Sequence, residues 1–195
     1  MTADQTFRLY IDGEWVEPAN GRYPVINPAT EEVVAQAPEA GREQVYDACK
    51  AAKAAFPAWS RTKPEERAEI LHRVADVIAK HADDYAPLAQ AETGATSATV
   101  KALQVNVAVQ RFRRYAKGAL EPVEIPLPPT ATESTPLAKG GLLGALVVRQ
   151  PVGVVTCITS YNNPWANPSG KIAPALAMGC TCVVKAAPQD PLSVF

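Results

Sequence analysis

The chain has 195 residues, of which 47% are hydrophobic and 20% are charged, and its formal net charge is −1. This composition is typical of a globular protein with a hydrophobic core, and the balanced charge argues against nucleic acid or an anionic membrane as a partner. The longest apolar run, residues 142–148, is far shorter than the ~20 residues that a membrane span needs, and the N-terminus lacks a signal-peptide pattern. We therefore expect a cytoplasmic protein.

The four cysteines do not have the spacing of a secreted disulfide framework, and no cysteine–histidine pair has zinc-finger spacing. Cys180 and Cys182 form a C-x-C pair in a strand-like run, where their side chains point the same way. Such a pair can bind a metal or undergo redox cycling, but buried cysteines also act as small apolar side chains, and we favour that interpretation. The sequence thus predicts no metal site and reduced thiols.

Two β-hairpins and a series of helices are predicted for the first 120 residues. Residues 7–16 alternate in hydrophobicity around Asp12-Gly13, a strong hairpin signal, and residues 22–37 repeat this form. An amphipathic helix follows over residues 41–59, and a later helix closes at Gly94. The apolar face predicted for the first helix comprises Val45, Ala48, Cys49, Ala52 and Phe56.

A long helix is predicted from about residue 97 to residue 119. Its periodicity turns four side chains inward, namely Val100, Leu103, Val107 and Tyr115. A short basic cluster on this helix is expected to form a solvated or salt-bridged face, and it consists of Arg111, Arg113 and Arg114.

Residues 121–136 contain five prolines, which exclude a helix and a central strand. An extended arm or an exposed edge is expected there. The next segment, residues 141–148, reads as an apolar strand behind a glycine turn, and its glycines match neither of the common phosphate-binding patterns. An apolar edge of this kind needs cover, which pairing with another subunit would supply.

The last part of the chain reads as strand, loop, crossover helix and strand. A β-branched run over residues 152–159 leads into a polar loop, a small-residue helical pattern extends to Met178, and a second β-rich run follows over residues 180–185. Parallel α/β sheets bind ligands beyond the carboxyl ends of their strands. A ligand crevice is therefore predicted at residues 159–163 and 185–188.

Three side chains in this region suggest chemistry. The Asn162 amide can donate to a carbonyl oxygen that gains negative charge, although an asparagine before a proline-bearing turn is also an ordinary turn former. Lys171 lies in the predicted crossover helix, where it can extend into solvent or carry a proton if its pKa is lowered. Lys185 ends the second strand, where it is either solvated or bonded to a ribose or phosphate. No Ser-His-Asp or Cys-His arrangement is evident.

Two long motifs here resemble those of the NAD(P)-dependent aldehyde dehydrogenase superfamily. P-V-G-V-V-T-C-I-T-S-Y-N-N-P is similar to the family's P-x-G-V-V-x-x-I-x-P-W-N-F-P, and K-I-A-P-A-L-A-M-G-C-T-C-V-V-K is similar to K-x-A-P-A-L-A-A-G-N-x-V-V-x-K. Earlier strings, including I-D-G-E-W-V and E-T-G, resemble the family's N-terminal half in the right order. The resemblance covers essentially the whole chain.

This resemblance implies an α/β fold: an incomplete Rossmann-like cofactor domain preceded by N-terminal β-hairpins and a helical segment, with an extended oligomerisation arm. The implied segments are residues 1–120, an arm over residues 121–150, and the first βαβ unit over residues 151–195. The arm implies a homo-oligomer, a dimer or a tetramer. The implied substrate is a small-molecule aldehyde, which NAD or NADP oxidises to an acid through a cysteine thiohemiacetal and thioester.

The resemblance also assigns site residues. Asn162 matches the oxyanion-hole asparagine, and Lys171 matches a helix lysine proposed for a proton path. The cofactor site is implied to include Ile158, Thr159, Ser160, Tyr161, Lys185 and Pro188. Lys185 matches the lysine that bonds the adenosine ribose.

Several positions depart from the family pattern. Ser160, Tyr161 and Asn163 replace the usual proline, tryptophan and phenylalanine, which makes the pocket mouth more polar. Residues 186–188 lack the usual glutamate that disfavours a 2′-phosphate, which leaves the choice of NAD or NADP open. The family's nucleophilic cysteine and general-base glutamate lie beyond Phe195, so the chain alone is expected to be inactive. A truncated assembly module and one half of a split enzyme are the alternatives.

Overall fold

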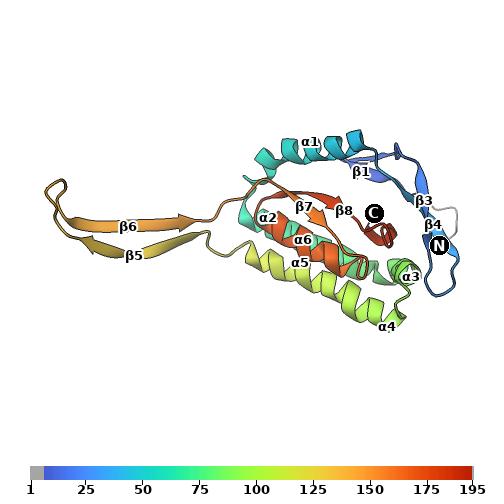
Figure 1. The fold of residues 1–195 in the computed structure, drawn as a ribbon. Coiled ribbons are helices and arrows are strands. Elements are labelled where there is room, and N and C mark those ends of the chain that lie inside the picture. Colours follow the sequence, from blue (N-terminus) through green and yellow to red (C-terminus); the bar gives the residue numbers. More distant parts are fainter. Residues whose placement is uncertain (1–6, 195) are drawn as a thin grey trace.

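The computed structural model describes residues 7–194, so the first six residues and Phe195, the outer ends of two predicted segments, lie outside the described part. The fold is α/β, as predicted. Figure 1 shows a body of helices and short strands from which one long hairpin projects. Within residues 7–194, no helix is long and apolar enough to cross a membrane.

Both predicted N-terminal hairpins are present. Strands β1 (Leu9–Ile11) and β2 (Glu14–Val16) pair antiparallel, and so do β3 (Arg22–Ile26) and β4 (Val33–Pro38). Asp12 and Gly13 both have positive φ, 54° and 85°, which is the backbone that a two-residue hairpin turn requires.

Three helices follow: α1 (Arg42–Trp59), α2 (Pro64–Lys80) and α3 (Ala82–Thr93). Gly94 ends α3 in the left-handed conformation (φ 70°), as predicted. The apolar face predicted for α1 is present, but none of the helix's residues is buried and Val45 is 49% exposed. The predicted amphipathic helix is thus confirmed, and its apolar face is only partly covered within the described residues.

The predicted long helix is continuous but not regular. It comprises α4 (Ser97–Thr99), the π-helical segment η1 (Val100–Val105) and α5 (Asn106–Gly118). A π-turn holds more residues than an α-turn, so it shifts the side chains that follow around the helix axis. As a result Leu103, predicted to face inward, is 59% exposed, whereas Gln104 is fully buried and none of its side-chain polar atoms has a hydrogen-bond partner.

The proline-rich segment forms strand β5 (Glu124–Thr132), which pairs antiparallel with β6 (Gly141–Val148). Their register shifts between Leu127 and Thr130, where Pro128 and Pro129 supply no backbone N–H. Every residue of the hairpin is exposed, and Figure 1 shows it reaching away from the body. The predicted exposed, extended arm is confirmed as a feature of the fold.

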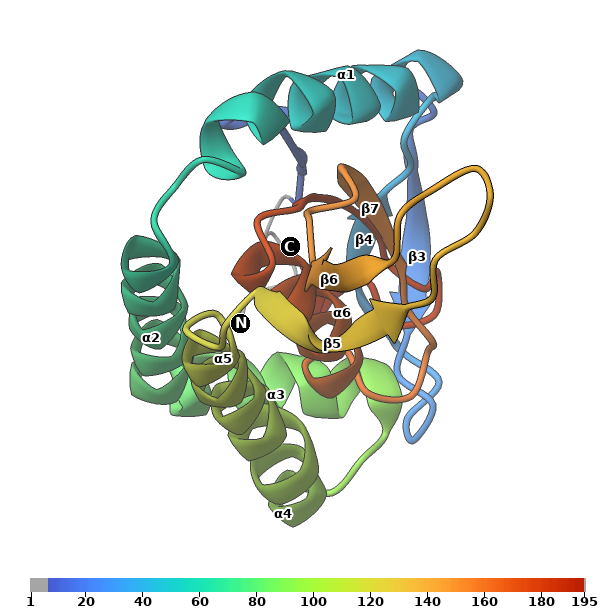
Figure 2. The ribbon, with the colours of Figure 1, turned by 90° about the vertical axis from the view of Figure 1, so that its left-hand side faces the viewer.

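The C-terminal unit is a βαβ element. Strands β7 (Val154–Ile158) and β8 (Thr181–Lys185) are parallel, helix α6 (Ala166–Ala177) connects them, and the short 3₁₀ helix η2 (Leu192–Val194) follows. In Figure 2, α1 lies on one side of the strand pair, and α6, α2 and α5 lie on the other. The main hydrophobic core forms between α2, α5 and α6, and it includes Leu71, Ala75, Phe112, Ala116 and Ala173.

Candidate functional site

The carboxyl ends of β7 and β8 lie side by side, because Ile158 pairs with Lys185 in the parallel register. Thr159 joins the two segments that leave these strands. Its backbone N–H donates to the Lys185 carbonyl (3.1 Å), and its hydroxyl accepts from the Ala187 N–H (3.2 Å). Thr159 is buried, so its side chain shapes the crevice from within and does not present a hydroxyl to a ligand.

A groove with a volume of about 1270 Å³ runs between α1 and β8. Lys185 and Pro188, both predicted cofactor residues, lie along it. Much of the rest is apolar and comes from α1 and the core side of β8, including Val45, Ala48, Ala52, Trp59 and Val183. The exposed Lys185 ammonium is therefore a polar group at the end of an apolar groove, an arrangement that suits a partly apolar ligand with hydroxyl or phosphate groups.

The loop after β7 does not line this groove. Ile158 and Tyr161 are more than 60% exposed, at 62% and 64%. The structure therefore brings Lys185 and Pro188 together on the groove. It places Ile158 at the end of β7, and Ser160, Tyr161 and Asn162 in the loop beyond it. The predicted set of cofactor residues thus falls into two neighbouring groups.

Asn162 belongs to a cluster of three polar side chains. Its Oδ1 atom accepts hydrogen bonds from the Ser160 hydroxyl (3.0 Å) and from the Asn167 amide nitrogen (3.1 Å). The Asn167 nitrogen also donates to the Ser160 hydroxyl (2.7 Å). Within residues 7–194, no hydrogen bond engages the Asn162 amide nitrogen, and the residue is exposed. Asn162 does lie in a turn, and its amide nitrogen also carries two N–H donors.

Sequence reasoning missed Asn167. It lies in the first turn of α6, and its backbone N–H donates to the Asn163 carbonyl (3.0 Å). Its spacing is the signal that could have found it. Asn167 follows Asn162 by five residues, so a side chain in the first turn of the helix can reach back to the preceding loop.

Helix α6 is held at both ends by arginine side chains. At its start, the Arg111 guanidinium donates to the Ala166 carbonyl, and a Cβ added at Gly170 would lie 2.9 Å from Arg111 Nη1. At its end, Arg67 Nε donates to the Ala177 carbonyl (3.0 Å). Arg113 forms an ion pair with Asp76 (3.0 Å), so the predicted basic cluster is partly salt-bridged, and Arg111 contacts the site's helix.

Lys171, also on α6, is exposed, consistent with a lysine that extends into solvent. Burial raises the pKa of the Cys157 thiol, and it outweighs the opposing effects of a hydrogen bond with Cys182 and of the Lys171 charge. Burial and the neighbouring Cys157 thiol raise the pKa of Cys182 to about 12. Because a thiolate is the reactive form, neither cysteine is suited to act as a nucleophile.

A pair of carboxyl groups, Glu92 and Asp190, lies behind the β8 end. The Glu92 carboxylate accepts the backbone N–H groups of Leu192 (2.8 Å) and Ser193 (3.0 Å), and it thereby ties α3 to η2. Burial raises the pKa of Glu92, and burial together with the Glu92 charge raises the pKa of Asp190 to about 7. Across residues 7–194, no three His, Cys, Asp or Glu side chains could hold a metal ion together.

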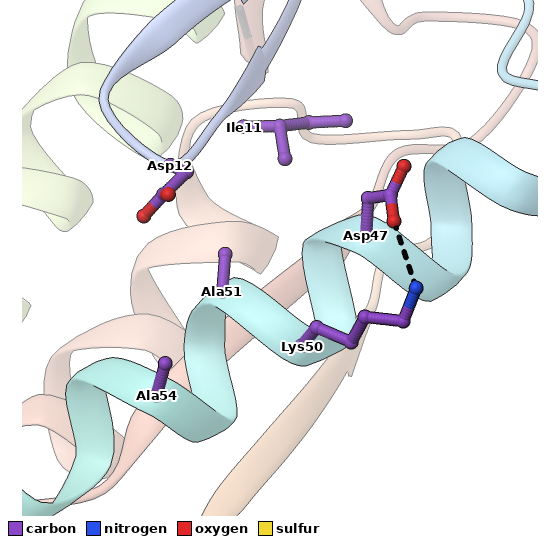
Figure 3. A pocket seen from close by; sticks show the side chains of 6 residues that line it. All are labelled: Ile11, Asp12, Asp47, Lys50, Ala51 and Ala54. Carbon is purple, nitrogen blue, oxygen red and sulfur yellow. Dashed lines mark hydrogen bonds and ion pairs between the residues drawn. The ribbon is translucent and has the colours of Figure 1, made fainter.

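A smaller hollow of about 370 Å³ lies between the β1–β2 turn and α1. Figure 3 shows the residues that line it: Ile11, Asp12, Asp47, Lys50, Ala51 and Ala54. Asp47 and Lys50 form an exposed ion pair (3.1 Å), and the remaining lining is mostly small and apolar. The hollow offers no reactive group to a ligand, so the candidate site remains the edge beyond β7 and β8.

Comparison with known proteins decides the family. The model of the aldehyde dehydrogenase family matches residues 15–195. The chain belongs to the aldehyde dehydrogenase family. It is 32% identical to the human 2-aminomuconic semialdehyde dehydrogenase, over 90% of this chain and 34% of that protein. It is 34% identical to the glutarate-semialdehyde dehydrogenase of Pseudomonas putida, over 98% of this chain and 38% of that protein.

Solved structures agree. An NADP-dependent enzyme from E. coli superposes with a TM-score of 0.85 at 31% identity, covering 96% of this chain and 37% of that one. A betaine aldehyde dehydrogenase from Staphylococcus aureus, solved with NAD⁺, gives a TM-score of 0.81 at 34% identity over the same 96% of this chain and 37% of its own. The chain thus spans a little over a third of the length of these relatives. The resemblance stated from the motifs, to an N-terminal part of this family, is confirmed.

Proposed function

We propose that this chain forms part of an enzyme that oxidises an aldehyde to a carboxylic acid with NAD⁺ or NADP⁺. The observation that carries the proposal is the exposed Asn162 beyond β7: Ser160 and Asn167 engage its amide oxygen, and within residues 7–194 no hydrogen bond engages its amide nitrogen. This chain supplies the oxyanion donor and part of the cofactor site. The nucleophilic thiol is proposed to be neither Cys157 nor Cys182, because burial raises the pKa of both thiols.

Asn162 acts when a thiolate adds to the aldehyde carbon. The carbonyl oxygen then gains a full negative charge, and a fixed N–H donor stabilises that charge more than it stabilises the neutral carbonyl. Lys171 is proposed to carry protons between the site and solvent, as its exposed ammonium on α6 allows.

The cofactor, when bound, accepts the hydride that leaves the substrate carbon. The chemical character of the groove beside β8 suits a dinucleotide. The Lys185 ammonium can donate to ribose hydroxyls, and the apolar α1 side suits an adenine ring. Ile158, Ser160 and Tyr161 are proposed to lie along the cofactor, with Pro188 at the rim and Thr159 shaping the loop from within. No carboxylate follows Lys185 over residues 186–188, so nothing in this segment repels a 2′-phosphate. Both NAD⁺ and NADP⁺ are therefore candidates.

The hairpin of β5 and β6 is proposed to join subunits of a homo-oligomer, a dimer or a tetramer. Its support is the row of exposed apolar side chains, among them Leu127, Leu142, Leu143 and Leu146. Isolated two-stranded hairpins are marginally stable in water, and a partner subunit would cover these side chains.

The test is an assay of the protein at its natural length, with a panel of aldehydes and either cofactor, following the absorbance of the reduced nicotinamide. Wild-type protein is expected to turn over, and Asn162→Ala to lower kcat roughly 10²–10³-fold, the usual cost of one lost oxyanion donor. Wild-type kcat in Asn162→Ala would contradict the role of the amide. The 195-residue chain alone is expected to be inactive.

An intact-mass measurement of the protein from its native source distinguishes the alternatives. A mass well above that of the 195-residue chain supports the proposal. A mass of about that chain, with no activity, supports an assembly module built on the exposed hairpin. Activity that returns only when a second polypeptide is added supports a split enzyme.

A further inference from the structure

We propose that Asn167 is a positioning residue, which orients the Asn162 amide so that its nitrogen, and not its oxygen, faces the reacting carbonyl. This inference rests on the proposed function, because it assigns a task to Asn162 as an oxyanion donor. It concerns a side chain that none of the predicted site residues includes.

The orientation of an asparagine amide decides whether it can act as a donor. One end of the group carries two N–H donors and the other end carries an acceptor oxygen, and the two ends have nearly the same shape. An amide that rotates freely presents oxygen to the developing oxyanion part of the time, and oxygen there is repulsive. A catalytic asparagine therefore needs partners that hold one end.

Asn162 has such partners on one end only. Its Oδ1 accepts from Asn167 Nδ2 (3.1 Å) and from the Ser160 hydroxyl (3.0 Å), and Asn167 Nδ2 also holds Ser160 (2.7 Å). Three short contacts thus close a triangle around the oxygen. Since the oxygen and the nitrogen of an amide diverge from the same planar carbon, fixing the oxygen in this triangle directs the nitrogen to a different side.

Asn167 can impose this orientation because it stands on a fixed element. It directly follows Ala166, whose carbonyl accepts both the Arg111 guanidinium and the Ser169 hydroxyl (2.8 Å). The close approach of Arg111 to Gly170 fixes the next turn of α6 against α5. Ser160, by contrast, lies in the exposed loop. Asn167 therefore fixes the position of the amide, and Ser160 adds a second hydrogen-bonded connection between Asn167 and Asn162.

The decisive substitution is Asn167→Asp. Aspartate keeps the shape of asparagine but offers only acceptors, so Asn162 must turn its nitrogen toward residue 167 and its oxygen toward the substrate. We expect kcat to fall about a hundredfold, close to the loss in Asn162→Ala, with the KM for aldehyde changed much less. Asn167→Ala, which releases the amide without reversing it, is expected to lower kcat roughly tenfold.

A double-mutant cycle separates orientation from the added negative charge. If Asn167 acts through Asn162, then Asn167→Asp has little further effect in an Asn162→Ala background. A loss of equal size in both backgrounds would show a direct charge effect and overturn the proposal. Asn106→Asp, the same chemical change on the exposed face of α5, is the control and should retain wild-type kcat.

The two proposals fail in different ways. Absence of NAD(P)⁺-dependent aldehyde oxidation in the wild-type protein contradicts the proposed function. Wild-type kcat in Asn167→Asp, in an active protein, contradicts the positioning role. The orientation can also be tested without an activity assay, by NMR measurement of hydrogen exchange rates in ¹⁵N-labelled asparagine side chains. The side-chain N–H groups of Asn167 should exchange slowly, and those of Asn162 should exchange freely. The reverse pattern would overturn the orientation whether or not the protein is active.

Discussion

Two pairs of apolar strands differ in their surroundings. The β5–β6 hairpin and the β7–β8 pair both contain runs of apolar residues, yet every hairpin residue is exposed, whereas Cys157 is fully buried and Thr181 is buried. The hairpin strands are joined by a short turn that adds no cover. The parallel strands are joined by α6, which packs against their face and continues the core of α2 and α5. The crossover helix therefore covers part of the parallel pair, whereas the hairpin turn covers neither of its strands.

The same substitution in the two regions should have very different costs. Leu71→Ala removes a fully buried side chain from the core beneath α6 and should lower the free energy of unfolding by about 2–5 kcal/mol, measured by urea titration. Leu142→Ala removes a side chain that is 78% exposed, and its effect on unfolding should stay within about 0.5 kcal/mol.

Leu142→Ala should instead weaken association between subunits, which sedimentation velocity measures as a shift toward smaller species. Equal losses of unfolding free energy in the two variants would refute the contrast between the regions. An unchanged oligomer, or a monomeric wild-type protein, would refute the proposed role of the hairpin.

A smaller effect, which depends on pH, is expected where the end of the βαβ unit is tied to α3. The Asp190 pKa is raised to about 7 by burial and the Glu92 charge, so the folded state favours the protonated carboxyl. Stability from this group is present at pH 4 and is lost as the pH rises through 7. Asp190→Asn should therefore match the wild type near pH 4 and be more stable at pH 8, on the order of 2 kcal/mol. Thermal melts across this range that show the same pH dependence for both proteins would count against this assignment.

Substitutions at the hairpin tip are expected to have the smallest effect on the unfolding of the core. A Cβ at Gly140 would lie 2.5 Å from the Thr132 carbonyl oxygen, whereas a Cβ at the adjacent Gly141 would meet nothing within 4 Å. Gly140→Ala should therefore distort the tip and increase its cleavage in limited proteolysis, while Gly141→Ala leaves the tip intact. Neither should shift the unfolding of the α2–α5–α6 core. A core destabilised by Gly140→Ala would mean that the hairpin is coupled to the body.

Much of the fold follows from local chemistry, and the errors occur where local periodicity stops being informative. The Asp12-Gly13 turn, the Gly94 helix end and the proline-rich extended arm are each determined by backbone preferences of a few residues, so pattern reasoning found them. Leu103 was assigned inward because the 3.6-residue period was assumed throughout, and the π-turn of η1 breaks that period. Val45 was correctly placed on the apolar face of α1, but this face borders a groove and leaves Val45 49% exposed.

The candidate site divides in the same way. Motif resemblance predicted roles for Asn162, Lys171 and Lys185, whose strand-end and helix positions follow from the spacing of the βαβ unit, and these roles stay predictions. It did not identify Asn167 or Glu92, because their tasks depend on contacts with Asn162 and with Leu192 and Ser193. Thr159 is predicted to lie along the cofactor, and the structure adds that its hydroxyl accepts a hydrogen bond from the Ala187 N–H.

By itself the sequence determined the order of strands and helices, the exposed arm, the parallel crossover unit and the family, since each depends on residues close together in the chain or on an uninterrupted motif. Only the tertiary structure decided which apolar faces are covered and which way the Asn162 amide points. Burial and hydrogen bonding of those groups depend on side chains from separate segments, and no local pattern specifies how such segments meet.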